Sequence, residues 1–237
     1  MKSKQFVITS AMICIASLFS INRAYGYPWI SPYAYCLNNP VKYVDPDGRD
    51  VWEIDAEGRI VQRIEDKTQD AFYMVEKDAD GNYQRTYTTD DEGNKSYNSI
   101  SFDYGTIKSV KQETVKTDAG EQTLTMFNIK GDEKATQLYE FMANPSVTTN
   151  VEWSHDKIGT EKSQKNVVGT MHHQSKTVQG YYLMKYGYTI REDSHSHPNG
   201  TGPSPTDFTV ATHISAKHKN ASFSVYIGQG KYLFYVP

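Results

Sequence analysis

The strongest constraint on this 237-residue chain is a thirteen-residue stretch, His-Ser-His-Pro-Asn-Gly-Thr-Gly-Pro-Ser-Pro-Thr-Asp, which runs from His195 to Asp207. In an extended strand alternate side chains point to the same face, so the imidazoles of His195 and His197 project together. The Asn-Gly-Thr-Gly-Pro run after Pro198 predicts a turn. We therefore expect a strand, a tight reversal and then a new element beside the strand end.

That new element has the sequence of a helix start. Ser204 can serve as N-cap, Pro205 occupies the first helical position, and Asp207 completes the S-x-x-D form of a capping box. Two imidazole nitrogens and one carboxylate oxygen are three zinc ligands, and the open fourth position is typical of a catalytic site. We therefore predict a zinc site with His195, His197 and Asp207 as ligands. The alternative is a plain helix cap beside two surface histidines, but the coincidence of all three features favours a metal.

These residues carry a family resemblance that covers about the last hundred residues. The string His195-Ser-His-Pro followed by Ser204-x-x-Asp207 resembles the metal motif of JAB/MPN-type (JAMM) metallopeptidases, which cleave peptide or isopeptide bonds and include deubiquitinases. The resemblance implies a JAB/MPN-like mixed sheet flanked by helices, and an acidic general base on an earlier strand. Glu152 fits by order and would take a proton from the zinc-bound water and return it to the leaving amine. We expect the Ser204 hydroxyl to donate to the oxyanion.

Glu152 is placed by the elements around it. Residues 132–144 have helical apolar spacing, Pro145 ends that helix, and residues 147–153 are expected to form the strand that carries Glu152. Glu161 and Glu140 stay open as alternative bases. The apolar positions of the helix are Ala135, Leu138, Tyr139 and Met142.

The rest of the C-terminal region alternates strands and helices, which predicts the α+β class. We expect strands at 167–172, 188–197, 222–227 and 231–236, and helices at 176–186 and 205–219. The last strand alternates aromatic and aliphatic residues on both faces, so we expect it to be buried on both. Four further histidines are interpreted as structural or surface residues, and His155 as a candidate support for the site. The four are His172, His173, His213 and His218.

The N-terminus predicts the compartment. Lys2 and Lys4 precede an apolar run from Phe6 to Phe19, and Ala24 and Gly26 are small residues at the two positions that a signal peptidase inspects, as in a secretory signal peptide. The run is shorter than the roughly 20 residues of a membrane span, so an uncleaved anchor is the lesser alternative. We expect a secreted or periplasmic, cell-envelope protein without stable membrane insertion. Cleavage would leave Cys36 without an intramolecular partner.

A second resemblance follows the signal sequence. The string from Ser31 to Arg49, with Asn38-Asn-Pro and Asp45-Pro-Asp-Gly, resembles the end of an RHS/YD-repeat associated core, after which a variable toxin domain begins. The resemblance implies a toxin cassette and an immunity protein as partner. Read as residues alone, the stretch is a Pro- and Asn-rich linker with two turns.

Between the two resemblances, acidic turn signals separate Tyr-, Val-, Ile- and Thr-rich runs, which predicts a β-meander with hairpin turns. Calcium binding by these Asp residues is the alternative, but no cluster has a full EF-hand loop. The expected organisation is a signal peptide at 1–26, an RHS-like junction at 27–50, a β-rich meander at 51–130 and the JAB/MPN-like domain at 131–237. The turn signals end at Gly58, Gly81, Gly93 and Gly120.

Taken together, the sequence predicts an exported zinc metallopeptidase that acts as an RHS-associated toxin on a peptide or protein substrate. The formal net charge is −3 and becomes −6 when the signal, with three positive and no acidic residues, is removed. An acidic chain argues against a nucleic-acid partner. Two alternatives stay open: a non-catalytic, metal-stabilised binding module and an inactive remnant of a toxin cassette.

Overall fold

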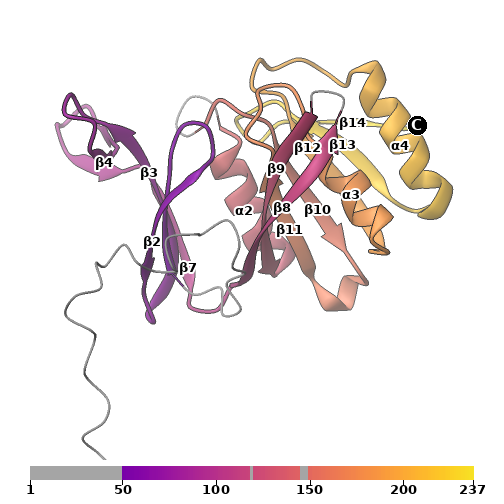
Figure 1. Cartoon of the computed structure of the whole chain (residues 1–237), viewed down its shortest axis with the longest axis horizontal. Coiled ribbons are helices and arrows are strands. Elements are labelled where there is room, and N and C mark those ends of the chain that lie inside the picture. Colours follow the sequence, from indigo (N-terminus) through magenta and orange to yellow (C-terminus); the bar gives the residue numbers. More distant parts are fainter. Residues whose placement is uncertain (1–49, 118–119, 145–148) are drawn as a thin grey trace, which may run out of the picture. The chain divides into compact units, whose positions relative to one another are not determined.

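A computed structural model describes residues 50–117, 120–144 and 149–237 (Figure 1). The expected signal peptide, the RHS-like junction up to residue 49 and both cysteines lie outside these residues. Within the described part, no helix combines the length and apolar character needed to cross a membrane.

The described chain begins with a small sheet. Its strand order is β2-β1-β3-β4, and β7 also pairs with β3. Strands β1 and β3 run parallel, so this part is not a simple meander. The strands are β1 (Asp50–Ile54), β2 (Ile60–Glu65), β3 (Gln69–Lys77), β4 (Tyr83–Arg85) and β7 (Ser99–Asp103), with a separate hairpin of β5 (Tyr87–Thr89) and β6 (Lys95–Tyr97).

The larger sheet has seven strands in the order β14-β13-β12-β10-β11-β9-β8. Only β12 and β13 are parallel neighbours, so the sheet is mixed, as the resemblance implied. Strands β8 and β9 precede residue 131, and the sheet therefore extends across the boundary expected at residue 130. Its strands are β8 (Ile107–Thr117), β9 (Gly120–Lys130), β10 (Trp153–Ile158), β11 (Lys165–Thr170), β12 (Ile190–Ser196), β13 (Ser222–Tyr226) and β14 (Tyr232–Tyr235).

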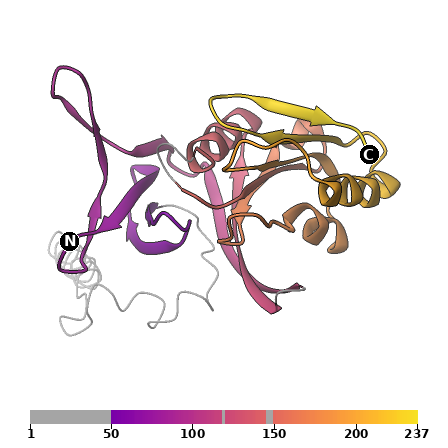
Figure 2. The same ribbon diagram turned by 90° about the horizontal axis from the view of Figure 1, so that it is seen from above.

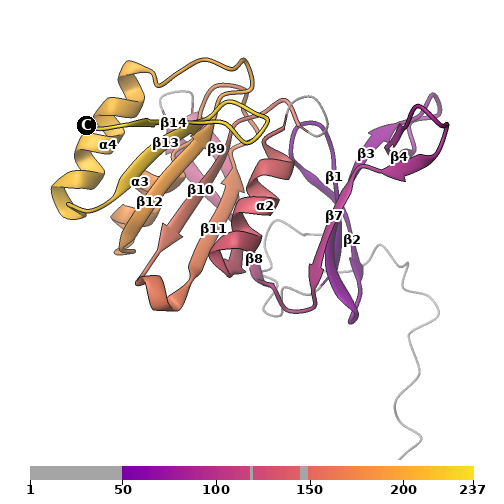
Figure 3. The ribbon, with the colours of Figure 1, turned by 180° about the vertical axis from the view of Figure 1, so that it is seen from behind.

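Helices cover both faces of this sheet, which confirms the α+β class. Helix α2 (Asp132–Met142) contributes all four predicted apolar positions to one core, and each is fully buried. Helices α3 (Gln179–Lys185) and α4 (Pro205–Lys217) contribute to the core on the other face. Figure 3 shows α2 between the sheet and β7, and Figure 2 shows the same layers from above. A 3₁₀ turn, η2 (Glu161–Ser163), precedes β11.

The small sheet shares the core of α2. Trp52 stacks on Phe72 with ring centroids 4.9 Å apart, and Phe72 meets Phe127 of β9 edge-on at 5.2 Å. Phe127 in turn stacks on Trp153 of β10 at 6.4 Å. This aromatic chain joins β1 and β3 to the strands of the larger sheet, so these two strands bury apolar side chains against it.

One burial prediction is wrong. Strand β14 pairs only with β13 and forms an edge of the sheet, where Phe234 is 72% and Val236 80% exposed. Alternating aromatic and aliphatic residues predict a strand equally well at an edge and in the centre, because the pattern does not report the number of neighbours.

Candidate metal centre

The two histidines lie at the end of β12. His195 is the second-last residue of the strand, and His197 comes directly after the strand ends. The backbone N–H of His197 donates to the Tyr226 carbonyl at 3.0 Å. As expected for alternate residues of a strand, both imidazoles face the same side, and their Nε2 atoms are 3.2 Å apart. His195 is buried and His197 half-buried.

Asp207 reaches the histidines from the first turn of α4. The capping box is present: the Ser204 hydroxyl accepts from the Asp207 N–H, and the Asp207 carboxylate accepts from the Ser204 N–H. This exchange fixes the carboxylate at the helix start, with Oδ1 3.2 Å from Nε2 of His195 and Oδ2 3.6 Å from Nε2 of His197.

The three groups fit a metal ion. Their ligand atoms all lie within 4.8 Å of one another. Ligands about 2.05 Å from a tetrahedral zinc are about 3.3 Å apart. The two Nε2 atoms are 3.2 Å apart, and Asp207 Oδ1 is 3.2 Å from Nε2 of His195, which is close to that spacing. The Nδ1–H of His197 donates to the Thr201 carbonyl at 3.0 Å, which leaves Nε2 as the free lone pair of a neutral ring. His195, His197 and Asp207 can therefore hold a divalent metal.

Sheet register places Glu152 opposite the histidines. Ser154 pairs with His195 in the antiparallel β10–β12 ladder, so the position two residues before Ser154 faces His197. Glu152 occupies that position just ahead of β10, rather than inside the expected strand 147–153, and its Oε1 is 3.8 Å from Nε2 of His197. The carboxylate therefore borders the metal site without belonging to the ligand set.

Burial sets the charges of the site. It raises the pKa of Glu152 to about 7, an effect that His195 opposes and Asp207 reinforces. Asp207 behaves in the opposite way, because its hydrogen bond to His195 and its capping contacts overcome burial and lower its pKa to about 2. Burial lowers the pKa of His197, whereas contacts with Asp207 outweigh burial and raise that of His195. One carboxylate is thus a permanent anion, and the other can exchange a proton near neutral pH.

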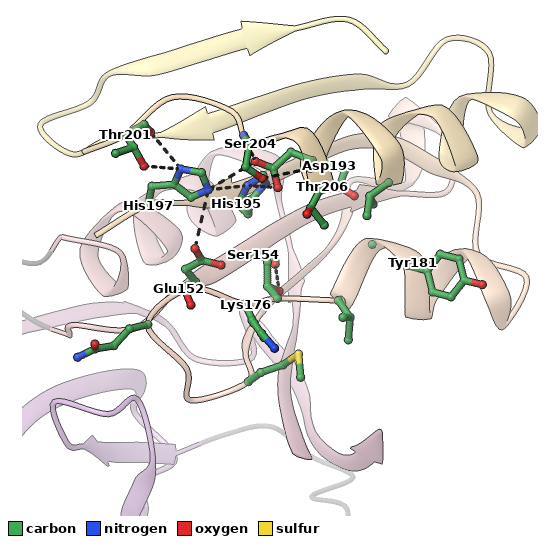
Figure 4. Close-up of a pocket in the computed structure, with 18 of the residues that line it drawn as sticks. Glu152, Ser154, Lys176, Tyr181, Asp193, His195, His197, Thr201, Ser204 and Thr206 are labelled. Atoms are coloured by element: carbon green, nitrogen blue, oxygen red, sulfur yellow. Dashed lines mark hydrogen bonds and ion pairs between the residues drawn. The ribbon is translucent and has the colours of Figure 1, made fainter. Parts of the chain in front are cut away.

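These groups open into one cavity of about 570 Å³, drawn in Figure 4. The lining includes the candidate metal ligands, Glu152 and Ser204, and the side chain of Lys176 lies at the far wall. Neither alternative base lines this cavity. Glu140 lies on α2 and accepts from the Tyr232 hydroxyl at 2.9 Å, and Glu161 is exposed on η2.

Two residues of the site were not predicted. Thr201 holds the ring of His197, as described above, and Asp193 lines the cavity on the strand that carries the histidines. Asp193 faces Asp156 across the β10–β12 ladder, and burial raises the pKa of both carboxyls, Asp193 to about 6. Alternation along the strand would have found Asp193, because it lies two residues before His195.

The other histidines do not join the cluster. His155 lies on the opposite face of the sheet against Tyr139, and its Nε2 is 3.1 Å from Oδ1 of Asn166. It therefore does not support the candidate metal ligands, contrary to what the sequence suggests. His173 is half-buried, while His213 and His218 belong to α4 and its C-terminal cap. His172 has a structural role that is described below.

Comparison with known proteins gives one match. Residues 127–223 match the model of the family described as JAB-like toxin 1. Searches of curated proteins and of solved structures found no match. The matched range contains β10 to β12, all three candidate metal ligands and Glu152.

Proposed function

We propose that the JAB-like toxin domain, matched at residues 127–223, is a zinc-dependent metallopeptidase or isopeptidase. One observation carries the proposal: His195, His197 and Asp207 converge at distances that suit zinc, and a buried carboxylate, Glu152, faces them from the same cavity. When bound there, zinc would supply Lewis-acid chemistry and make hydroxide available near neutral pH.

The protein's own residues would divide the remaining work. Glu152, with a pKa of about 7, is poised to accept a proton at neutral pH and to return it to the leaving amine. The Ser204 oxygen accepts from the Asp207 N–H as a helix cap, which leaves its own proton free to be donated to a developing oxyanion. Glu152 and Ser204 line the same cavity, so one bound substrate could contact both groups.

Delivery is a separate part of the proposal. We propose export by a signal peptide at residues 1–26 and an origin in an RHS toxin cassette, with an immunity protein as natural inhibitor. This rests on the sequence before residue 50. N-terminal sequencing of the protein recovered from the envelope or medium would test it, and a chain that still begins at Met1 would contradict it.

The metal and the chemistry can be tested together. The chain from Tyr27 onward, loaded with zinc, is compared with His195→Ala and Glu152→Gln, and with His218→Ala at the far end of α4 as control. Elemental analysis should find about one zinc per chain in all but His195→Ala. Cleavage of a quenched fluorogenic peptide library should require both His195 and Glu152.

The outcomes separate the alternatives. Zinc retained in wild type without any cleavage would favour a metal-stabilised binding module, and no zinc even after loading would favour a remnant. Turnover that survives His195→Ala would refute the assignment of the site.

A further inference from the structure

The same turn occurs three times between residues 50 and 103, twice in the small sheet and once in the β5–β6 hairpin. In each, an Asp carboxylate accepts from the backbone N–H groups two and four residues later, and a glycine at the fourth position has a positive φ. The turns begin at Asp55, Asp78 and Asp90. Two of their glycines, Gly81 and Gly93, have no atom within 4 Å of where a Cβ would stand.

The first turn differs because it is packed against the candidate active site. A Cβ on Gly58 would stand 3.1 Å from both Thr170 and Trp153 and 3.2 Å from Val151. Two of these neighbours flank Glu152 in the sequence. The carbonyl of Ala56, in the same turn, accepts from the Asn150 N–H at 3.1 Å. The turn from Asp55 to Arg59 therefore abuts the segment that carries Glu152.

A second connection runs through His172. Its Nδ1–H donates to the Glu57 carbonyl at 3.1 Å, so Nε2 of the neutral ring accepts from the Thr125 hydroxyl at 2.9 Å. The residue has a φ of 57°, in the left-handed region that non-glycine residues rarely occupy. The two ring contacts thus hold a strained backbone in place.

That backbone holds Glu152 on both sides. The His172 N–H donates to the Thr170 hydroxyl at 3.0 Å, and this hydroxyl donates to the Glu152 carbonyl at 2.7 Å. The Glu152 N–H donates to the carbonyl of His173 at 2.8 Å. Both backbone polar groups of Glu152 thus depend on the chain around His172, which in turn is anchored on the Asp55–Arg59 turn.

We infer that Gly58 and His172 are positioning residues for Glu152, and that through them the N-terminal sheet is a working part of the candidate active site. The inference rests on the proposed function for its effect on turnover, but not for its effect on the Glu152 backbone. It assigns a role to residues 50–103 that the sequence left open.

The test compares Gly58→Ala with Gly81→Ala in the chain from Tyr27 onward. Each substitution adds a Cβ at a glycine with a similar positive φ, in two turns of the same type. Only the Cβ at residue 58 meets packed atoms. Two quantities are measured: kcat on the quenched peptide library per zinc-loaded chain, and hydrogen exchange of the Glu152 amide in the zinc-free chain, by NMR. His172→Asn is the second variant, because asparagine tolerates the left-handed region. Its shorter side chain cannot bridge the Glu57 carbonyl and the Thr125 hydroxyl.

We expect Gly58→Ala and His172→Asn to lower kcat roughly 100-fold, the scale expected for a misplaced catalytic group, with KM and zinc content unchanged. Exchange of the Glu152 amide should become faster in both, and Gly81→Ala should match wild type. Should Gly58→Ala fail to fold, His172→Asn carries the same comparison.

A variant pair that loses thermal stability yet keeps wild-type kcat and Glu152 exchange would overturn the inference, because the turn would then be structural only. If wild type itself cleaves no peptide, the proposed function fails, and amide exchange alone still decides whether the turn holds Glu152.

Discussion

Glu152 is a carboxylate kept at a cost to stability, and Glu152→Gln should reveal that cost. The side chain is buried beside Asp207, and burial raises its pKa from 4.5 to about 7. A neutral glutamine of nearly the same shape does not carry the desolvation penalty of a buried charge. We therefore expect the substitution to stabilise the metal-free protein at alkaline pH while it abolishes turnover.

The sign and size of this stability change follow from the linkage between protonation of Glu152 and folding. Between pH 4.5 and about 7 the folded state holds a proton on Glu152 that the unfolded state has released, so stability falls as pH rises through this window. At about 1.4 kcal/mol per pKa unit the full effect is about 3 kcal/mol. Roughly 2.5 kcal/mol of it falls between pH 5 and pH 8.

The assay is urea unfolding of wild type and Glu152→Gln at both pH values, with a chelator present because a bound cation would lower the pKa of Glu152. The advantage of glutamine should be about 2.5 kcal/mol larger at pH 8 than at pH 5. Titrating groups that do not interact with Glu152 behave alike in both proteins and cancel in this difference. Glu161→Gln, the same change at an exposed position, controls for net charge. An advantage equal at both pH values would show that Glu152 is an ordinary solvated carboxylate.

Three further predictions concern the metal and the core. Excess zinc at about 100 times its dissociation constant should stabilise wild type by about 2.7 kcal/mol in thermal unfolding, relative to the EDTA-treated protein. The same addition of zinc should not stabilise His195→Ala. Burial and the facing Asp193 raise the pKa of Asp156, so this carboxyl lowers the stability of the fold as pH rises above 3.8; Asp156→Asn should remove this contribution, so that the urea midpoint falls less between pH 4 and pH 8 than in wild type. Leu138→Ala in α2 removes a fully buried side chain and should cost about 2–5 kcal/mol in urea unfolding without changing zinc content.

The part of the site that the sequence predicts is the part formed by neighbours in the chain. His195, His197 and Asp207 lie within thirteen residues, and strand alternation, a turn and a capping box place them with no reference to the rest of the fold. Helix α2 was predictable for the same reason, because its four buried positions follow the helical period.

What the sequence could not predict depends on pairing between distant segments. Strands β8 and β9 have the residues of strands, but the pattern does not indicate which sheet they join, and their place in the sequence groups them with the N-terminal hairpins rather than with the larger sheet that they form. For the general base, order along the chain left three glutamates open. Sheet register brings Glu152 opposite His197 in the cavity, whereas Glu140 lies on α2 and Glu161 on η2, away from the cavity.

The contact between Glu152 and the histidines also depends on the pairing register of β10 and β12. A slip of one residue between β10 and β12 would bring Val151 or Trp153 opposite His197 and turn Glu152 to the α2 face. Three contacts oppose such a slip: the Trp153 N–H donates to the Ser196 hydroxyl at 2.9 Å, Lys157 pairs with Glu192 at 2.8 Å, and Trp153 is itself fully buried in the α2 core. Because that core is completed by the aromatic residues of β1 and β3, the N-terminal sheet helps to set the register on which the distance from Glu152 to the histidines depends.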